Sequence, residues 1–92
     1  MDYSEKQLEE IRRLAGELTP ASEISVLLDL PSEDQFLLDI GLHGHPARKA
    51  FLGGLAVTAN DLRRKNLQLA AACAPSAMEQ CCTYITRMIQ DL

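Results

Sequence analysis

Residues 18–40 read LTPASEISVLLDLPSEDQFLLDI and outline two short helices joined by a turn. Thr19 as N-cap and Pro20 at the first helical position predict the start of the first helix, because that position needs no backbone N–H. Pro31 ends it, since proline disfavours helical geometry in the residue before it. Ser32 is the expected N-cap of the second helix. This order is that of a helix-turn-helix, and its expected core is apolar: Ile24, Leu27, Leu28, Leu30, Phe36 and Leu37.

Helical signals continue on both sides of this stretch. Ser4 and Gln7 predict a capping box at the start of a helix over residues 4–16. A long helix is expected from Pro46 until the break at residues 74–75, and a last helix over residues 75–92. Their short join predicts an antiparallel hairpin. We therefore expect an all-α chain, with a helix-turn-helix-like unit of three short helices over residues 1–45 and a long antiparallel helical hairpin over residues 46–92, folding as one cooperative domain.

Two features of the long helix and its partner predict close packing and self-association. Gly53 and Gly54 are costly inside a helix, which indicates a kink or the close approach of another helix. The chain has two Phe, two Tyr and no Trp, so its core is small and association of copies would offset the deficit. The residues expected to hold the copies together are apolar and follow the hairpin: Phe51, Leu55, Leu62, Met78, Ile85, Met88 and Ile89.

Charge divides the sequence into two parts of opposite sign. Residues 1–45 hold three basic and ten acidic side chains, a net charge of −7, whereas residues 46–92 hold six basic and three acidic, a net charge of +3. The second helix of the helix-turn-helix is expected to offer Glu33, Asp34 and Asp39 to solvent, and no Lys or Arg occurs over residues 18–40. Phosphate contacts from Lys and Arg supply most of the affinity for DNA, so this helix alone should bind DNA poorly. The candidate DNA contacts lie instead in the long helix: Arg48, Lys49, Arg63, Arg64 and Lys65.

The sequence gives no support for an enzyme, a metal site or a bound cofactor. It has no GxxxxGK[ST] phosphate loop and no nucleophile–base pair that its spacing would bring together. Cys73, Cys81 and Cys82 lack the spacing of zinc ligands and are expected as small buried apolar residues. No apolar run approaches the roughly 20 residues that cross a bilayer, and the charged start lacks the apolar centre of a signal peptide, so we expect a cytoplasmic chain without a membrane segment.

The order of these elements resembles that of phage terminase small subunits, most of all the compact type of phage and prophage-like regions. The segments that carry the resemblance are LTPASEISVLLDLPSEDQF at 18–36 and HPARKAFLGGLAVTANDLRRKNLQLAAACAPSAMEQCCTYITRM at 45–88. The resemblance implies a helix-turn-helix that recognises double-stranded phage DNA and a hairpin that assembles subunits into a ring. It also implies a separate large terminase subunit that holds the ATPase and nuclease. This chain departs from the pattern at Asp29, which stands where the turn usually has glycine.

Two functions remain open on the sequence. In the first, the chain is a small terminase-like protein that assembles through its hairpin and takes part in DNA recognition for packaging. In the second, it is an acidic helical interaction module that oligomerises or docks a basic partner without binding DNA. The opposite charges of the two halves suit the second reading as well as the first, because complementary surfaces favour head-to-tail association.

Overall fold

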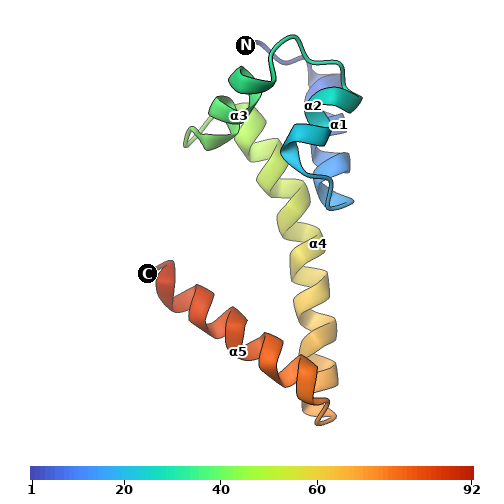
Figure 1. The fold of residues 1–92 in the computed structure, drawn as a ribbon, viewed down its shortest axis with the longest axis vertical. Helices are drawn as coiled ribbons and strands as arrows, with labels where there is room; N and C mark the ends of the chain where they lie inside the picture. The colour runs from blue at the N-terminus through green and yellow to red at the C-terminus, as the bar shows by residue number, and fades with distance from the viewer. The chain divides into compact units, whose positions relative to one another are not determined.

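The computed structural model describes all 92 residues as five α-helices without strands, which confirms the all-α prediction (Figure 1). The helices are α1 (Glu5–Gly16), α2 (Ala21–Leu27), α3 (Glu33–Gly41), α4 (Pro46–Ala71) and α5 (Pro75–Gln90). The chain divides into two compact parts: unit 1 is Met1–Thr58 and unit 2 is Ala59–Leu92. The boundary therefore lies within α4 and not between residues 45 and 46.

The predicted start of α1 is confirmed in detail. The Ser4 hydroxyl accepts a hydrogen bond from the Gln7 backbone N–H at 3.1 Å, and the Gln7 side chain accepts one from the Ser4 N–H at 2.9 Å. This reciprocal capping box satisfies two backbone donors that the helix itself leaves without partners. The helix then turns Ile11, Leu14 and Ala15 toward the core of unit 1.

Helices α2 and α3 form the expected helix-turn-helix outline with one change at its start. Pro20 has extended backbone and is itself the N-cap of α2, without a side-chain cap, so the prediction that Thr19 caps this helix is wrong. Asp29 adopts the left-handed conformation (φ 51°) after α2, as a residue in the place of the turn glycine must. Ser32 caps α3 as predicted, accepting the Gln35 N–H at 3.2 Å.

The core of unit 1 joins all four of its helical segments. Ile11, Ile24 and Phe36 are fully buried, and α4 adds the buried side chains of Ala47 and Ala50. These alanines lie in the first turns of α4. Unit 1 therefore extends through residue 58 because this part of α4 supplies one wall of its core.

Two of the residues expected in the helix-turn-helix core lie on its surface. Ile24 and Phe36 are fully buried, and Leu28 and Leu30 are partly buried against the core, but Leu27 is 63% exposed and Leu37 is 42% exposed. Helical geometry explains the error, because each residue turns the side-chain direction by about 100°. The inward face of α2 is set by Ile24, Ser25 and Leu28, and that of α3 by Phe36, Asp39 and Ile40, so Leu27 and Leu37 point away from the core.

Two residues of the predicted oligomerisation set lie in the first half of α4. Phe51 and Leu55 are partly buried and pack against the core of unit 1. Both side chains make contacts within the subunit, and their predicted role in joining copies stays a prediction.

Helix α4 crosses α1 at very close range, which confirms the close approach that the glycine pair predicted. A Cβ atom on Gly54 would clash with the carbonyl oxygen of Arg12 and would lie 2.9 Å from its carbonyl carbon and 3.1 Å from the Gly16 nitrogen. One turn later, the Thr58 hydroxyl donates a hydrogen bond to the Gly16 carbonyl oxygen at 2.5 Å. The backbones of α1 and α4 thus touch directly, and only glycine fits at residue 54.

This crossing predicts opposite effects for the two neighbouring glycines. Gly54→Ala should lower the free energy of unfolding by roughly 1–3 kcal/mol, because the added methyl group must push two backbones apart. Gly53→Ala is the matched control, since its Cβ would meet only the Arg12 side chain at an ordinary 3.7 Å. It should be neutral or stabilising by up to about 1 kcal/mol, the gain in helix propensity. Urea unfolding measures the free energy of unfolding of both variants. Equal changes in that free energy would contradict a close crossing at Gly54.

Unit 2 consists of the end of α4, a turn at residues 72–74 and α5, which folds back from this turn (Figure 1). Tyr84 links the two helices, since its hydroxyl accepts a hydrogen bond from the Asn66 amide at 2.8 Å and its ring lies 5.8 Å from the Arg63 guanidinium. Ala77 is the only buried residue of this unit. The hairpin therefore has side-chain contacts between its helices but no apolar core.

The cysteines of unit 2 correct another expectation. Cys73 and Cys82 are exposed and Cys81 is half-buried, so the prediction of buried apolar cysteines is wrong for the first two. Cys73 lies in the turn with left-handed backbone (φ 64°), and Cys82 lies on α5 where no other helix covers it. None of the five helices combines the length and apolar composition of a membrane span.

Candidate assembly and nucleic-acid interface

Helix α5 begins an apolar stripe, continued by Leu92, that unit 2 leaves largely exposed. Met78, Cys81, Ile85, Met88 and Leu92 follow one another at alternating steps of three and four residues, which is the spacing of a helix that packs against other helices. Ile85 is 56% exposed and Met88 69% exposed, and the adjacent Ile89 is 65% exposed. Leu62 of α4, at 45%, is exposed as well. The members of the predicted oligomerisation set that lie in unit 2 are thus available to a partner.

Part of this stripe lines an apolar groove between the two helices of unit 2. The groove encloses about 330 Å³, and Leu67, Cys81, Ile85 and Met88 form its apolar lining. Arg63 and Arg64 lie at the same groove and neither forms an ion pair. The stacking of Arg63 on Tyr84 gives its side chain a defined direction. The groove therefore offers apolar contacts beside two positive charges.

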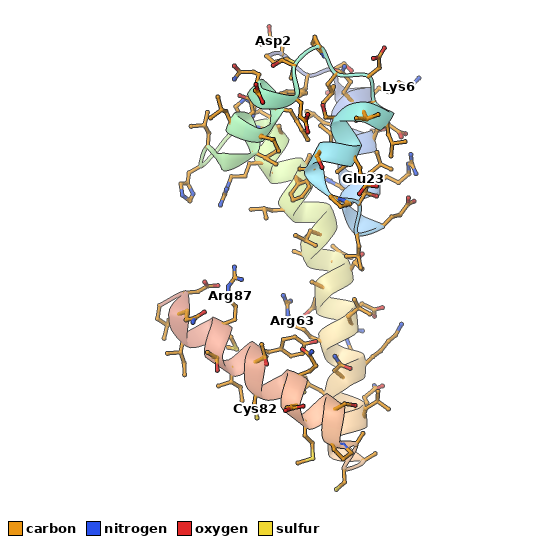
Figure 2. The ribbon with its side chains drawn as sticks, in the orientation of Figure 1. Asp2, Lys6, Glu23, Arg63, Cys82 and Arg87 are labelled. Atoms are coloured by element: carbon orange, nitrogen blue, oxygen red, sulfur yellow. The ribbon has the colours of Figure 1, made fainter.

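A more polar cleft of about 850 Å³ adjoins the groove and extends toward the C-terminal end of α5. Arg63 and Arg87 both line it, and Figure 2 shows the two side chains reaching into the space between α4 and α5. Arg87 is paired with Asp91 at 3.2 Å, which offsets its charge. Arg63 is thus shared by the groove and the cleft, and it is the more available of the two arginines.

The five basic residues predicted to contact DNA do not form one cluster. Arg48 is half-buried and donates a hydrogen bond to the Ile40 carbonyl oxygen at 2.9 Å, where its charge also suits the C-terminal end of α3. Lys49 is exposed and has no ion pair, whereas Lys65 pairs with Asp61 at 3.1 Å. Arg48 and Lys49 belong to unit 1 and the remaining three belong to unit 2. Lys49 and Arg64 have the fewest competing contacts.

A basic residue that the sequence did not single out joins the set in unit 1. The side chain of Arg12 on α1 lies over Gly53, one turn beyond Lys49 on α4, and Arg48 and Lys49 line a shallow groove that also includes Gly53. Arg12, Arg48 and Lys49 therefore form a basic patch. The glycine pair was the sequence feature that could have indicated a residue such as Arg12 at this place, because a close helix crossing at Gly53-Gly54 brings residues of another helix beside α4.

The helix-turn-helix instead presents an acidic surface with an apolar centre. Glu23, Val26 and Leu27 of α2 and Glu33 of α3 line a shallow pocket of about 350 Å³, and Glu23 lies on the outside of α2 (Figure 2). Val26 is 75% exposed. Neither glutamate takes part in an ion pair within the chain. We call these four residues the acidic surface; its charge repels DNA phosphates, as the sequence predicted for this helix.

One acidic residue of α3 is buried, contrary to expectation. Asp39 is 2% exposed, and its Oδ2 accepts a hydrogen bond from the Tyr3 hydroxyl at 2.7 Å. Its Oδ1 accepts one from the Gln35 amide at 2.8 Å and lies 3.7 Å from His45 Nε2. The Tyr3 hydrogen bond, with that of Gln35, lowers the pKa of Asp39 below its ordinary 3.8, although burial acts against them. Burial, with the Asp39 hydrogen bond, raises the pKa of Tyr3. This cluster holds the first residues of the chain against α3 and the start of α4.

The Asp39 cluster predicts a pH dependence for the stability of unit 1. Because the folded-state pKa of Asp39 is lowered, its contribution is complete above pH 3.8 and is lost as the pH falls through the lower folded value. Tyr3→Phe removes the leading cause, so unfolding should show lower stability at neutral pH and a smaller loss in acid. Tyr84→Phe, which removes a hydroxyl from unit 2, is the control. An unchanged acid dependence in Tyr3→Phe would contradict this assignment.

No protein-family model, curated protein or solved structure matches this chain. The resemblance to terminase small subunits accordingly stays a prediction from the sequence.

Proposed function

We propose that this chain is a small terminase-like assembly protein, which joins copies of itself through the hairpin of unit 2 and contacts DNA with basic residues of α4. The observation that carries the proposal is the unburied apolar stripe of α5. In this role the protein performs no chemistry of its own. It would collect several DNA-contacting subunits into one particle and present the DNA to a large terminase subunit.

The assembly step follows from the missing core of unit 2. A helix hairpin that buries only Ala77 gains little of the apolar burial that offsets the entropy of folding. Covering Ile85, Met88 and Ile89 with another helix would supply that burial, at roughly 25 cal/mol for each Å² removed from water. Association of copies of the chain can supply this burial without a different protein.

The DNA step is assigned to exposed basic residues outside the helix-turn-helix. The exposed Lys49 and Arg64, which have no ion pair, support this role most directly, and Lys65 and the other residues of the basic patch add positive charge beside them. A single subunit offers few such contacts. Assembly would multiply them, because linked binding sites raise the overall affinity without any new contact.

The second function, an interaction module that never binds DNA, is favoured by the acidic surface. Glu23 and Glu33 have no cation beside them in the chain, and they flank exposed Val26 and Leu27. Such a surface fits a basic partner. DNA binding by the purified protein is therefore the property that separates the two functions.

The assembly step predicts that an acidic residue in the stripe dissociates the particle. Ile85→Asp should shift the solution mass to that of a monomer, because it removes an apolar contact from the centre of the stripe and adds a charged group that is costly to desolvate. Gln80→Asp, at an exposed position of the same helix away from the stripe, is the matched control and should keep the wild-type mass. If Ile85→Asp assembles like the wild type, the interface lies elsewhere. Multi-angle light scattering provides the readout.

The DNA step predicts a loss of affinity that depends on salt. Lys49→Ala combined with Lys65→Ala should weaken binding to duplex DNA and reduce the slope of log affinity against log salt by up to about 2, one unit for each lost phosphate contact. Lys6→Ala removes an exposed charge of α1 and is the control. Fluorescence anisotropy over a salt series measures both quantities. A wild-type protein that ignores DNA would leave the interaction module as the function.

A further inference from the structure

We infer that the acidic surface of one copy docks into the apolar groove of unit 2 of another copy, so that the subunits associate head to tail. This inference rests on the proposed assembly through the hairpin and names the surface that covers it. The occupant of the groove would be the exposed edge of α2, with Val26 and Leu27 entering between α4 and α5.

The groove has an apolar centre and a positively charged edge. Leu67, Ile85 and Met88 supply the apolar lining, and Arg63 and Arg64 lie beside it without any carboxylate partner in the chain. A purely apolar surface docked in the groove would partly desolvate these two arginines and leave their charges unpaired. The occupant that suits the groove therefore combines apolar side chains with nearby acids.

The acidic surface has that combination within a short stretch. Glu23, Val26 and Leu27 stand at positions i, i+3 and i+4 of α2, which places a carboxylate and two apolar side chains on one face. Glu33 adds a second carboxylate from the first turn of α3. Val26 and Leu27 are 75% and 63% exposed, so they can enter a groove without any rearrangement of the core.

Charge also decides which pairs of surfaces can meet. Two acidic surfaces repel each other, and two grooves would bring Arg63 and Arg64 of one copy against those of the next. Self-complementary pairing of either surface is therefore disfavoured, whereas the pairing of unlike surfaces matches opposite charges. Contacts between unlike surfaces repeat from copy to copy and produce a ring when they close or a filament when they do not.

The same arrangement has a consequence for DNA. Arg63 and Arg64 would be occupied by the acids of the neighbouring copy, so they would not be available for phosphate. The DNA contacts of the assembled protein would then come from the basic patch of unit 1 and from Lys65.

Reciprocal charge reversal in the full-length chain tests this interface. Glu23→Arg/Glu33→Arg makes the acidic surface basic, and Arg63→Glu/Arg64→Glu makes the groove acidic. Each double variant alone should be monomeric at concentrations where the wild type assembles, because both of its surfaces then carry charge of one sign. Mixing the two variants should restore assembly, because each contact between the two different variants joins opposite charges. Light scattering without DNA measures the mass, and circular dichroism checks that helicity is unchanged.

Glu5→Arg/Glu9→Arg is the matched control, since it reverses two exposed acids of α1 that have no ion pair, and it should assemble like the wild type. A wild-type mass for Glu23→Arg/Glu33→Arg would overturn head-to-tail docking. Monomeric Ile85→Asp in the same experiment would then show that the hairpin still assembles the protein by another contact. A mixture of the two charge variants that stays monomeric would also overturn the inference. If the wild type itself is monomeric, the proposed function fails together with the docking.

Discussion

A two-helix hairpin cannot bury its own apolar side chains, and the proposed assembly of this protein follows from that constraint. Unit 1 has three large side chains with no exposure at all, drawn from three helices and closed by the small residues of α4. Unit 2 has only two helical segments, and Ala77 is its single buried residue. A long helix with an amphipathic return helix is poorly suited to a folded monomer and well suited to packing with further helices.

The crossing of α1 and α4 holds the first half of α4 within unit 1. Because Gly54 lets the backbones touch, this half of α4 forms part of the core of unit 1, and the hydrogen bond from Thr58 satisfies the last turn of α1 at the same place. The helix continues from there without interruption into the hairpin. The residues that face the core before residue 58 and the residues that remain exposed after it therefore belong to one element with two different roles. This division explains why Phe51 and Leu55 pack within unit 1 while Leu62 of the same helix is exposed.

The sequence predicted the elements more reliably than their faces. The five helices follow from prolines, capping residues and periodic apolar positions, all of which act locally, and the glycine pair indicated either a kink or a close approach, of which the structure shows the second. The errors fall where a neighbouring helix decides the outcome. Leu27 and Leu37 look like core residues, yet short helices of two turns have a narrow inward face that Ser25 and Asp39 occupy. Asp39 looked solvent-exposed because its partners Tyr3 and His45 are distant in the sequence or belong to a loop. The position of Arg12 beside α4 likewise depends on packing that no local pattern records.

For the candidate site too, the sequence did not show which side chains the packing of the helices leaves exposed. The acidic character of the helix-turn-helix and the basic character of α4 were readable from the charges alone, but the sequence did not reveal that the acids flank exposed apolar residues and that the arginines flank an apolar groove. These combinations depend on which side chains the fold leaves uncovered. They also give the opposite charges of the two halves a physical interpretation as complementary surfaces. Apolar patches of this kind on the surface of a single folded chain mark sites where another copy or a partner binds.

The decisive measurement for the proposed assembly is the solution mass of the unmodified protein over a range of concentrations, at low and high salt and with and without a duplex DNA fragment. Head-to-tail contacts between opposite charges predict a defined oligomer that dissociates into smaller species as salt is raised, and the proposed DNA contacts predict that it binds DNA at low salt. A monomer at every concentration, with unit 2 still helical, would contradict the proposed assembly, because the apolar stripe of α5 would then be stable in water without a partner.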